Sequence, residues 1–168
     1  MFMSYKKFMQ KVGQKRGQTV SMADLNWMEF DGIHYNEDAN EYHAKVSLKK
    51  EIRKGFTFRG KHVVLDNTML NHWSQYLSIG IMVNSYPDLM DAYFFVVDHR
   101  TTYIEPCFAD IPVDFHIKLL STKRKTKKDE ISFLHVLGKG QAIYRVDFVI
   151  VKEEKDIMKY YHKKHSQS

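Results

Sequence analysis

Three stretches in the C-terminal half alternate between apolar and polar residues, and this pattern limits the possible fold more than any other feature. They are residues 113–120, 131–137 and 141–151. A period of two places apolar side chains on one face of a β-strand and polar side chains on the other. The basic loop at 121–130 separates the first two stretches, and Gly138 and Gly140 mark a turn between the last two, so we expect neighbouring strands to pair as antiparallel hairpins. The pattern therefore predicts an antiparallel sheet with one face on a core.

Two earlier stretches are predicted to be strands as well. Residues 42–50 alternate, with Tyr42, Ala44, Val46 and Leu48 on one face. Residues 92–98, with the sequence AYFFVVD, are apolar on both faces, which is typical of a buried strand.

One principal helix is predicted over residues 66–78, where Leu70, Trp73 and Leu77 recur at helical spacing. Asp66 or Asn67 is expected to cap its start, and Gly80 lies just past its expected end, before a further strand at 79–83. A short C-terminal helix is expected around residues 153–162. The fold class is therefore α+β, a mostly antiparallel sheet packed with one principal helix.

The length and composition fit one folded domain. A chain of 168 residues predicts a single domain over 26–168, preceded by a flexible basic arm over 1–25 that Gly13 and Gly17 interrupt. The single cysteine, Cys107, excludes an intramolecular disulfide. No apolar run is long enough to predict a signal peptide or a transmembrane helix.

The net charge of +6 is concentrated in two blocks that contain no acidic residue. The first block holds Lys6, Lys7, Lys11, Lys15 and Arg16. The second, in the expected hairpin tip at 121–130, holds Lys123, Arg124, Lys125, Lys127 and Lys128. Without these blocks the rest of the chain is mildly acidic. Such blocks predict contacts with nucleic-acid phosphates or an anionic membrane surface, although solvated loops would also explain them.

Apart from the charged blocks, one loop offers a candidate apolar contact. Phe108 and Ile111 lie in the proline-bounded loop 103–112, where apolar side chains are less expected. They predict a hydrophobic contact with a membrane or a second copy, and a loop folded onto the core is the alternative.

No catalytic, metal or cofactor motif is visible. The nine histidines are scattered singly, and neither HExxH nor a glycine-rich phosphate loop occurs. His116 and His135 lie on hairpin strands, where we expect a surface cross-strand pair and no metal site. Cys107 is expected to be inert. A site around His99, Cys107 and His116 is the only enzymatic hypothesis that the sequence leaves open.

One family resemblance rests on a run of short segments. They are Tyr42-His43-Ala44-Lys45-Val46, Phe56-Thr57-Phe58-Arg59, His72-Trp73-Ser74-Gln75-Tyr76 and Ile79-Gly80, together with Ser4-Tyr5-Lys6-Lys7. In this order they resemble the matrix proteins of rhabdoviruses, and the short length resembles the plant-infecting members. The chain departs from that family because it lacks the PPxY and P[ST]AP motifs and ends soon after the last predicted strand.

The resemblance implies a non-enzymatic structural protein that self-associates and links the viral nucleocapsid or its RNA to an anionic membrane during assembly. It implies a location in virions and in the host cytoplasm, peripheral at membranes, and no small-molecule substrate. The alternative that the charge pattern leaves open is a small, basic nucleic-acid-binding regulator.

Overall fold

The computed structural model describes residues 1–15, 24–53 and 64–166. Its strands are β1 (Met3–Ser4), β2 (Met28–Glu29), β3 (Gly32–Asn36), β4 (Glu41–Leu48), β5 (Tyr93–Tyr103), β6 (Val113–Arg124), β7 (Lys128–Leu137) and β8 (Ala142–Val151). Its α-helices are α1 (Tyr5–Lys15), α2 (Lys50–Arg53), α3 (Asn67–Ser85) and α4 (Glu154–Ser166), and its 3-10 helices are η1 (Leu25–Trp27) and η3 (Pro87–Asp91). The predicted α+β class is confirmed.

The main sheet has the strand order β1-β3-β4-β6-β7-β8-β5, and β2 pairs with β4 outside this path. All strand pairs among the described residues are antiparallel. The alternating stretches form the meander β6-β7-β8, as predicted. Gly138 turns the chain between β7 and β8 with a φ of 58°, a left-handed conformation that favours glycine.

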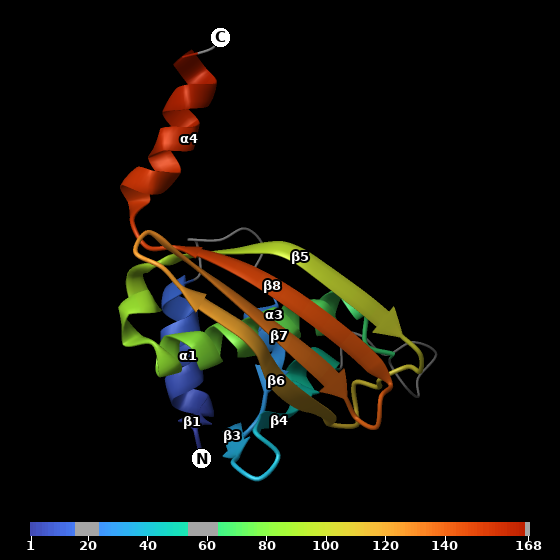
Figure 1. Cartoon of the computed structure of the whole chain (residues 1–168). Helices are drawn as coiled ribbons and strands as arrows, with labels where there is room; N and C mark the ends of the chain where they lie inside the picture. The colour runs from blue at the N-terminus through green and yellow to red at the C-terminus, as the bar shows by residue number, and fades with distance from the viewer. Residues whose placement is uncertain (16–23, 54–63, 167–168) are drawn as a thin grey trace.

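The core lies between α3 and the concave face of the sheet, which curves around the helix (Figure 1). Every second residue of β8 from Ala142 to Ile150 is buried, and Trp73 and Leu77 of α3 are buried opposite the sheet. These apolar side chains leave water together, which is the main favourable contribution to folding.

Helix α3 is longer than the sequence predicted, because it continues through residues 79–83 to Ser85. Ile79, Ile81 and Val83 are buried within the helix and do not form a strand. Gly80 does not end the helix either. A Cβ atom at Gly80 would lie 2.7 Å from the ring of Phe8 in α1, so glycine allows the two helices to approach closely.

The prediction of a flexible arm is wrong for the N-terminal residues that the structure describes. Residues 5–15 form α1, and its Phe8 and Val12 are buried in the core. These two apolar positions are four residues apart and therefore share one face of the helix. Residues 16–23 lie outside the described part of the chain.

Two elements at the edges of the molecule also differ from expectation. Strand β5 is the last strand of the sheet order, so it is an edge strand, and Val97 is 59% exposed. The expectation of a strand buried on both faces is therefore wrong. Helix α4 points away from the sheet (Figure 1), and it runs past the predicted end at residue 162. None of the described helices combines the length and apolar content that crossing a bilayer requires.

Candidate active site

Polar side chains gather on the first turns of α3. Asp66 caps the helix and accepts a hydrogen bond from the Thr68 N–H at 2.7 Å. Asn67 and Asn71 are four residues apart and share one side of the helix. His72 follows Asn71 directly and so lies on the neighbouring side. All three side chains are at least partly exposed, whereas most of the later part of α3 is buried. This end of the helix is therefore its accessible part.

On one side of α3, His72 pairs with Asp24, which directly precedes η1. Nδ1 of His72 lies 3.3 Å from the Asp24 carboxylate, and the Tyr76 hydroxyl donates to the same carboxylate at 2.5 Å. Asp24 is only 7% exposed, and a carboxylate this deeply buried needs such partners. The His72 side chain remains 24% exposed, and its Nε2 forms no hydrogen bond with another described residue.

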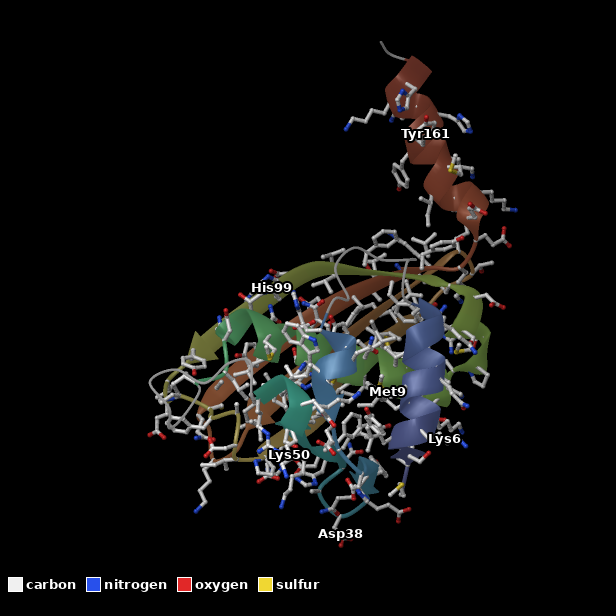
Figure 2. All side chains as sticks on the ribbon, turned by 180° about the vertical axis from the view of Figure 1, so that it is seen from behind. Lys6, Met9, Asp38, Lys50, His99 and Tyr161 are labelled. Carbon is white, nitrogen blue, oxygen red and sulfur yellow. The ribbon has the colours of Figure 1, made fainter. Side chains whose placement is uncertain are left out.

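On the neighbouring side of α3, two asparagines contact the sheet. Asn71 Nδ2 lies 3.4 Å from Nδ1 of His99, a residue of β5 that Figure 2 labels on the sheet. The Asn71 Oδ1 atom is buried and accepts no hydrogen bond from the described residues. Asn67 Oδ1 accepts a hydrogen bond from the Tyr144 hydroxyl at 2.6 Å. Burial raises the pKa of Tyr144, so this hydroxyl stays protonated and acts as a donor.

This arrangement is suited to general base chemistry. When a carboxylate accepts from Nδ1–H of a histidine, it fixes the tautomer in which Nε2 can take a proton, and it stabilises the resulting imidazolium. Asp24 and His72 have this relation. Within residues 1–15, 24–53 and 64–166, no three histidine, cysteine or acidic side chains are grouped to hold a metal ion. The chemistry that these side chains support is proton transfer.

The hypothesis of a site around His99, Cys107 and His116 is wrong. The Cys107 N–H donates to the Tyr103 hydroxyl at 3.3 Å, and the Cys107 side chain is buried. Burial also raises the pKa of its thiol, which makes it a poor nucleophile. His116 lies across from His43 of β4 in the sheet register, with ring centroids 5.1 Å apart, and its imidazole contacts Glu41.

The expected pair of His116 and His135 does not form either. In the register of β6 and β7, His116 lies opposite Val136 and His135 lies opposite Ile117. A shift of one residue places the two imidazoles on opposite faces of the sheet. His135 is therefore buried in the core, and His116 is on the outer face.

The structure divides the first basic block into three parts. Lys6, Lys7 and Lys11 line a groove on α1. Lys15 is fully buried, where its Nζ donates to the Ala92 carbonyl at 2.8 Å and lies 5.1 Å from the centre of the Phe94 ring. Burial lowers the pKa of Lys15 to about 8. Arg16 lies outside the described residues.

The second block is partly neutralised by its own surroundings. Arg124 forms ion pairs with Asp88 and Asp129, and Lys125 lies 3.6 Å from Glu130. The strands also extend further than predicted, so only residues 125–127 form the turn between β6 and β7. Lys123 lies within β6, and Lys127 and Lys128 line a separate groove beside α4. All five basic residues of the block are exposed, and their contact with a polyanion stays a prediction.

Of the two loop residues predicted to make a hydrophobic contact, Ile111 is 57% exposed. Phe108 is only partly exposed, and its backbone forms an isolated antiparallel bridge with Val64. A hydrophobic contact of this loop with another surface stays a prediction.

Neither half of the Asp24–His72 pair was predicted as a functional residue. The two residues are 48 positions apart, and no spacing motif joins them. The sequence offers only an aspartate in a mostly apolar stretch and a histidine within the predicted helix. Their contact depends on how η1 packs against α3, which a single sequence does not encode as a local pattern.

Comparison with known proteins identifies the fold and no sequence family. No family model matches the chain, and no curated protein matches it. A solved structure of a proposed thioesterase from Shewanella oneidensis matches with a TM-score of 0.53 and 10% identity, covering 87% of this chain and 99% of that one. A proposed thioesterase from Lactococcus lactis has a TM-score of 0.50 and 10% identity, with 79% and 99% covered.

A third match is a Ralstonia eutropha protein described as a proposed thioesterase related to phenylacetic acid degradation. Its TM-score is 0.50 and its identity 10%, covering 83% of this chain and 98% of that one. At such low identity these matches establish the fold alone. An antiparallel sheet wrapped around one central helix, here α3, is the hotdog-like fold.

These neighbours correct the functional expectations from the sequence. The resemblance to rhabdovirus matrix proteins is wrong, because the structures that share this fold over nearly their whole length are described as thioesterases. The same finding overturns the non-enzymatic assembly function and its alternative, the nucleic-acid-binding regulator. It also overturns the expected partners, which were a second copy, viral nucleocapsid or RNA and an anionic membrane, with no small-molecule substrate. The location in virions rested on that resemblance alone.

Proposed function

We propose that this protein hydrolyses acyl thioesters. The observation that carries the proposal is the buried Asp24 carboxylate, which holds His72 at 3.3 Å on the accessible end of the central helix. The neighbours that share the hotdog-like fold are described as thioesterases, and this supports the reaction class. Fold alone does not determine function, and the Asp24–His72 pair is the feature of this chain that supports hydrolysis.

In the proposed reaction, Nε2 of His72 removes a proton from a water molecule as its oxygen attacks the thioester carbonyl carbon. The tetrahedral intermediate then collapses and the carbon–sulfur bond breaks. The departing thiolate receives the proton from the imidazolium, so the products are a carboxylic acid and a thiol. Asp24 stabilises the transient positive charge on His72, and Tyr76 holds Asp24 in place through its 2.5 Å hydrogen bond.

Asn71 is the proposed group that orients the substrate. It occupies the helix position before His72, and its amide group lies beside His99 of β5. Its Oδ1 is buried and has no hydrogen-bond partner among the described residues, so one polar atom of the amide is left for a ligand. An amide N–H donor near the developing oxyanion would lower the barrier to attack.

The test is an assay of hydrolysis with a panel of acyl thioesters, in which the release of free thiol is measured. We expect His72→Ala to lower kcat/KM by roughly 10²- to 10⁴-fold, the range for loss of a general base. The matched control is His162→Ala, which removes an exposed histidine of α4. If His72→Ala retains the wild-type rate, the assignment of the base is wrong. If the wild type hydrolyses no thioester, the proposed function is wrong.

A further inference from the structure

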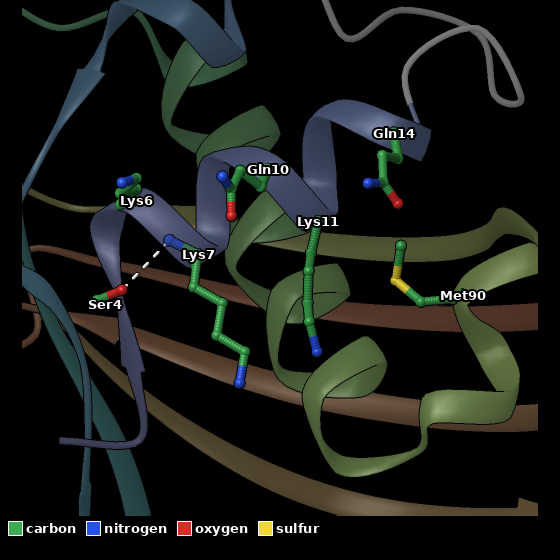
Figure 3. A pocket seen from close by; sticks show the side chains of 7 residues that line it. All are labelled: Ser4, Lys6, Lys7, Gln10, Lys11, Gln14 and Met90. Atoms are coloured by element: carbon green, nitrogen blue, oxygen red, sulfur yellow. Dashed lines mark hydrogen bonds between the residues drawn. The ribbon is translucent and has the colours of Figure 1, made fainter.

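A cationic groove runs along the exposed side of α1, on an element that the proposed hydrolysis does not use. It has a volume of about 750 Å³ and is lined by Ser4, Lys6, Lys7, Gln10, Lys11, Gln14 and Met90. Figure 3 shows the long side chains of Lys7 and Lys11 extending in the same direction from the helix. This follows from their spacing of four residues, which places them on the same side of an α-helix.

The three lysines of the groove are unpaired within the described residues. Neither Lys6, Lys7 nor Lys11 forms an ion pair or a side-chain hydrogen bond there, and no acidic residue lines the groove. Lys152, by contrast, lies 3.0 Å from the carboxylate of Asp129. The groove is therefore a local excess of positive charge.

This placement destabilises the helix in the absence of a ligand. Like charges four residues apart repel each other, and α1 has no acidic residue in its first turn. Partial burial, followed by repulsion from Lys7, lowers the pKa of Lys11. An anion between the two ammonium groups would remove this repulsion.

We propose that Lys6, Lys7 and Lys11 bind the phosphate group of a soluble small molecule. Lysine ammonium groups are common ligands of phosphate oxygens, and Ser4, Gln10 and Gln14 add neutral hydrogen-bonding groups beside them. Met90 of η3 supplies an apolar contact for the remainder of such a molecule. The volume of the groove lies in the range of small-molecule sites.

The packing of α1 distinguishes this ligand from a membrane. A helix that lies on a membrane inserts an apolar face between the lipid headgroups. In α1 the apolar residues Phe8 and Val12 are buried against the core, so the helix has no such face to insert. Lys15, which would extend the row of cations, is also buried. Three ammonium groups around one groove are suited to a compact anion.

The test is calorimetric titration with inorganic pyrophosphate, comparing the wild type with the Lys7→Gln/Lys11→Gln variant. We expect the variant to bind at least tenfold more weakly, and the wild-type affinity to fall as salt is raised. Its thermal stability should be unchanged or higher, because a repulsion has been removed. The Lys118→Gln/Lys139→Gln control removes the same charge from two exposed lysines elsewhere and should bind like the wild type.

Several results would overturn the proposal. They are no binding of pyrophosphate by the wild type, equal affinity of the Lys7→Gln/Lys11→Gln variant, or equal weakening in the control variant. Co-sedimentation with phosphatidylserine vesicles that pyrophosphate does not displace would assign the groove to a lipid surface instead. Binding is measured without turnover, so failure here is distinct from failure of the proposed hydrolysis.

Discussion

Acidification from pH 7 to pH 3 is expected to remove about 4 kcal/mol from the free energy of unfolding through His135 alone. This side chain is fully buried, and burial lowers its pKa to about 3 from an ordinary value of 6.5. The Ser78 hydroxyl donates to the Ser74 carbonyl at 2.8 Å and lies 2.7 Å from Nε2 of His135. Nε2 is then the donor to Ser78, and Nδ1 has no partner among the described residues.

The free energy of unfolding falls with decreasing pH because the unfolded state binds the proton at a higher pH than the folded state does. Between pH 6.5 and pH 3 the unfolded chain takes up a proton at His135, whereas the folded chain keeps the imidazole neutral. Stability is therefore complete above pH 6.5 and is lost as the pH falls. A single proton of this kind gives a slope of about 1.4 kcal/mol per pH unit.

The measurement is urea unfolding of the wild type and of His135→Gln at a series of pH values. The variant cannot gain this proton, so the stability advantage of the wild type should shrink by about 1.4 kcal/mol for each pH unit between 6 and 4. A matched control, His162→Gln, changes an exposed histidine on α4 and should leave the wild-type slope unchanged. Parallel pH profiles for the wild type and His135→Gln would show that His135 does not resist protonation.

Removal of the Asp129 carboxylate is the second large expected effect. Asp129 is fully buried, and its oxygens lie 2.6 Å from Arg124 Nε and 3.0 Å from Lys152 Nζ. The backbone N–H of Lys125 also donates to this carboxylate at 3.0 Å, which closes the turn between β6 and β7. Loss of one partner from such a pair leaves cations without compensation in a partly desolvated position.

We expect Asp129→Ala to lower the free energy of unfolding by about 3 kcal/mol. Its control is Glu130→Ala, one residue further along. Glu130 is partly exposed and lies 3.6 Å from Lys125 Nζ, so its removal should cost less than about 0.5 kcal/mol. Equal losses in the two variants, measured by urea unfolding, would mean that the buried ion pairs contribute no more than a surface contact.

The C-terminal sheet was predictable because an alternation of apolar and polar residues fits a β-strand with one buried face and does not fit a helix. In β8, a period of two from Ala142 to Ile150 matches the buried face residue for residue. The same period of two explains why the register between β6 and β7 decides which face of the sheet His116 and His135 occupy. A difference of one position places one imidazole on the outer face and the other in the core.

Continuous apolar stretches were predicted less well, because they lack a period. Residues 79–83 are buried on all sides, and this is equally compatible with a strand or with the interior of a helix. Residues 92–98 look like a buried strand, but β5 is at the edge of the sheet and Val97 is exposed. Strand order determines burial here, and a local stretch of sequence does not contain it.

The candidate site was not predictable for a related reason. The contact between Asp24 and His72 spans 48 positions and depends on tertiary packing. Charge counting was misleading at Arg124, because one partner, Asp129, lies just outside the acid-free block and the other, Asp88, lies 36 positions earlier in the chain. For Lys15, polarity predicted exposure, but a carbonyl and an aromatic ring compensate a buried ammonium group.

The most direct test of the central claim is a double-mutant cycle on thioester hydrolysis with Asp24→Asn, His72→Ala and their combination. If the two side chains act as one unit, Asp24→Asn should lower kcat/KM by roughly 10²-fold or more, and adding it to His72→Ala should change the rate by less than about threefold. Losses that multiply in the double variant, or wild-type rates in either single variant, would contradict the assignment of Asp24 and His72 as the catalytic pair.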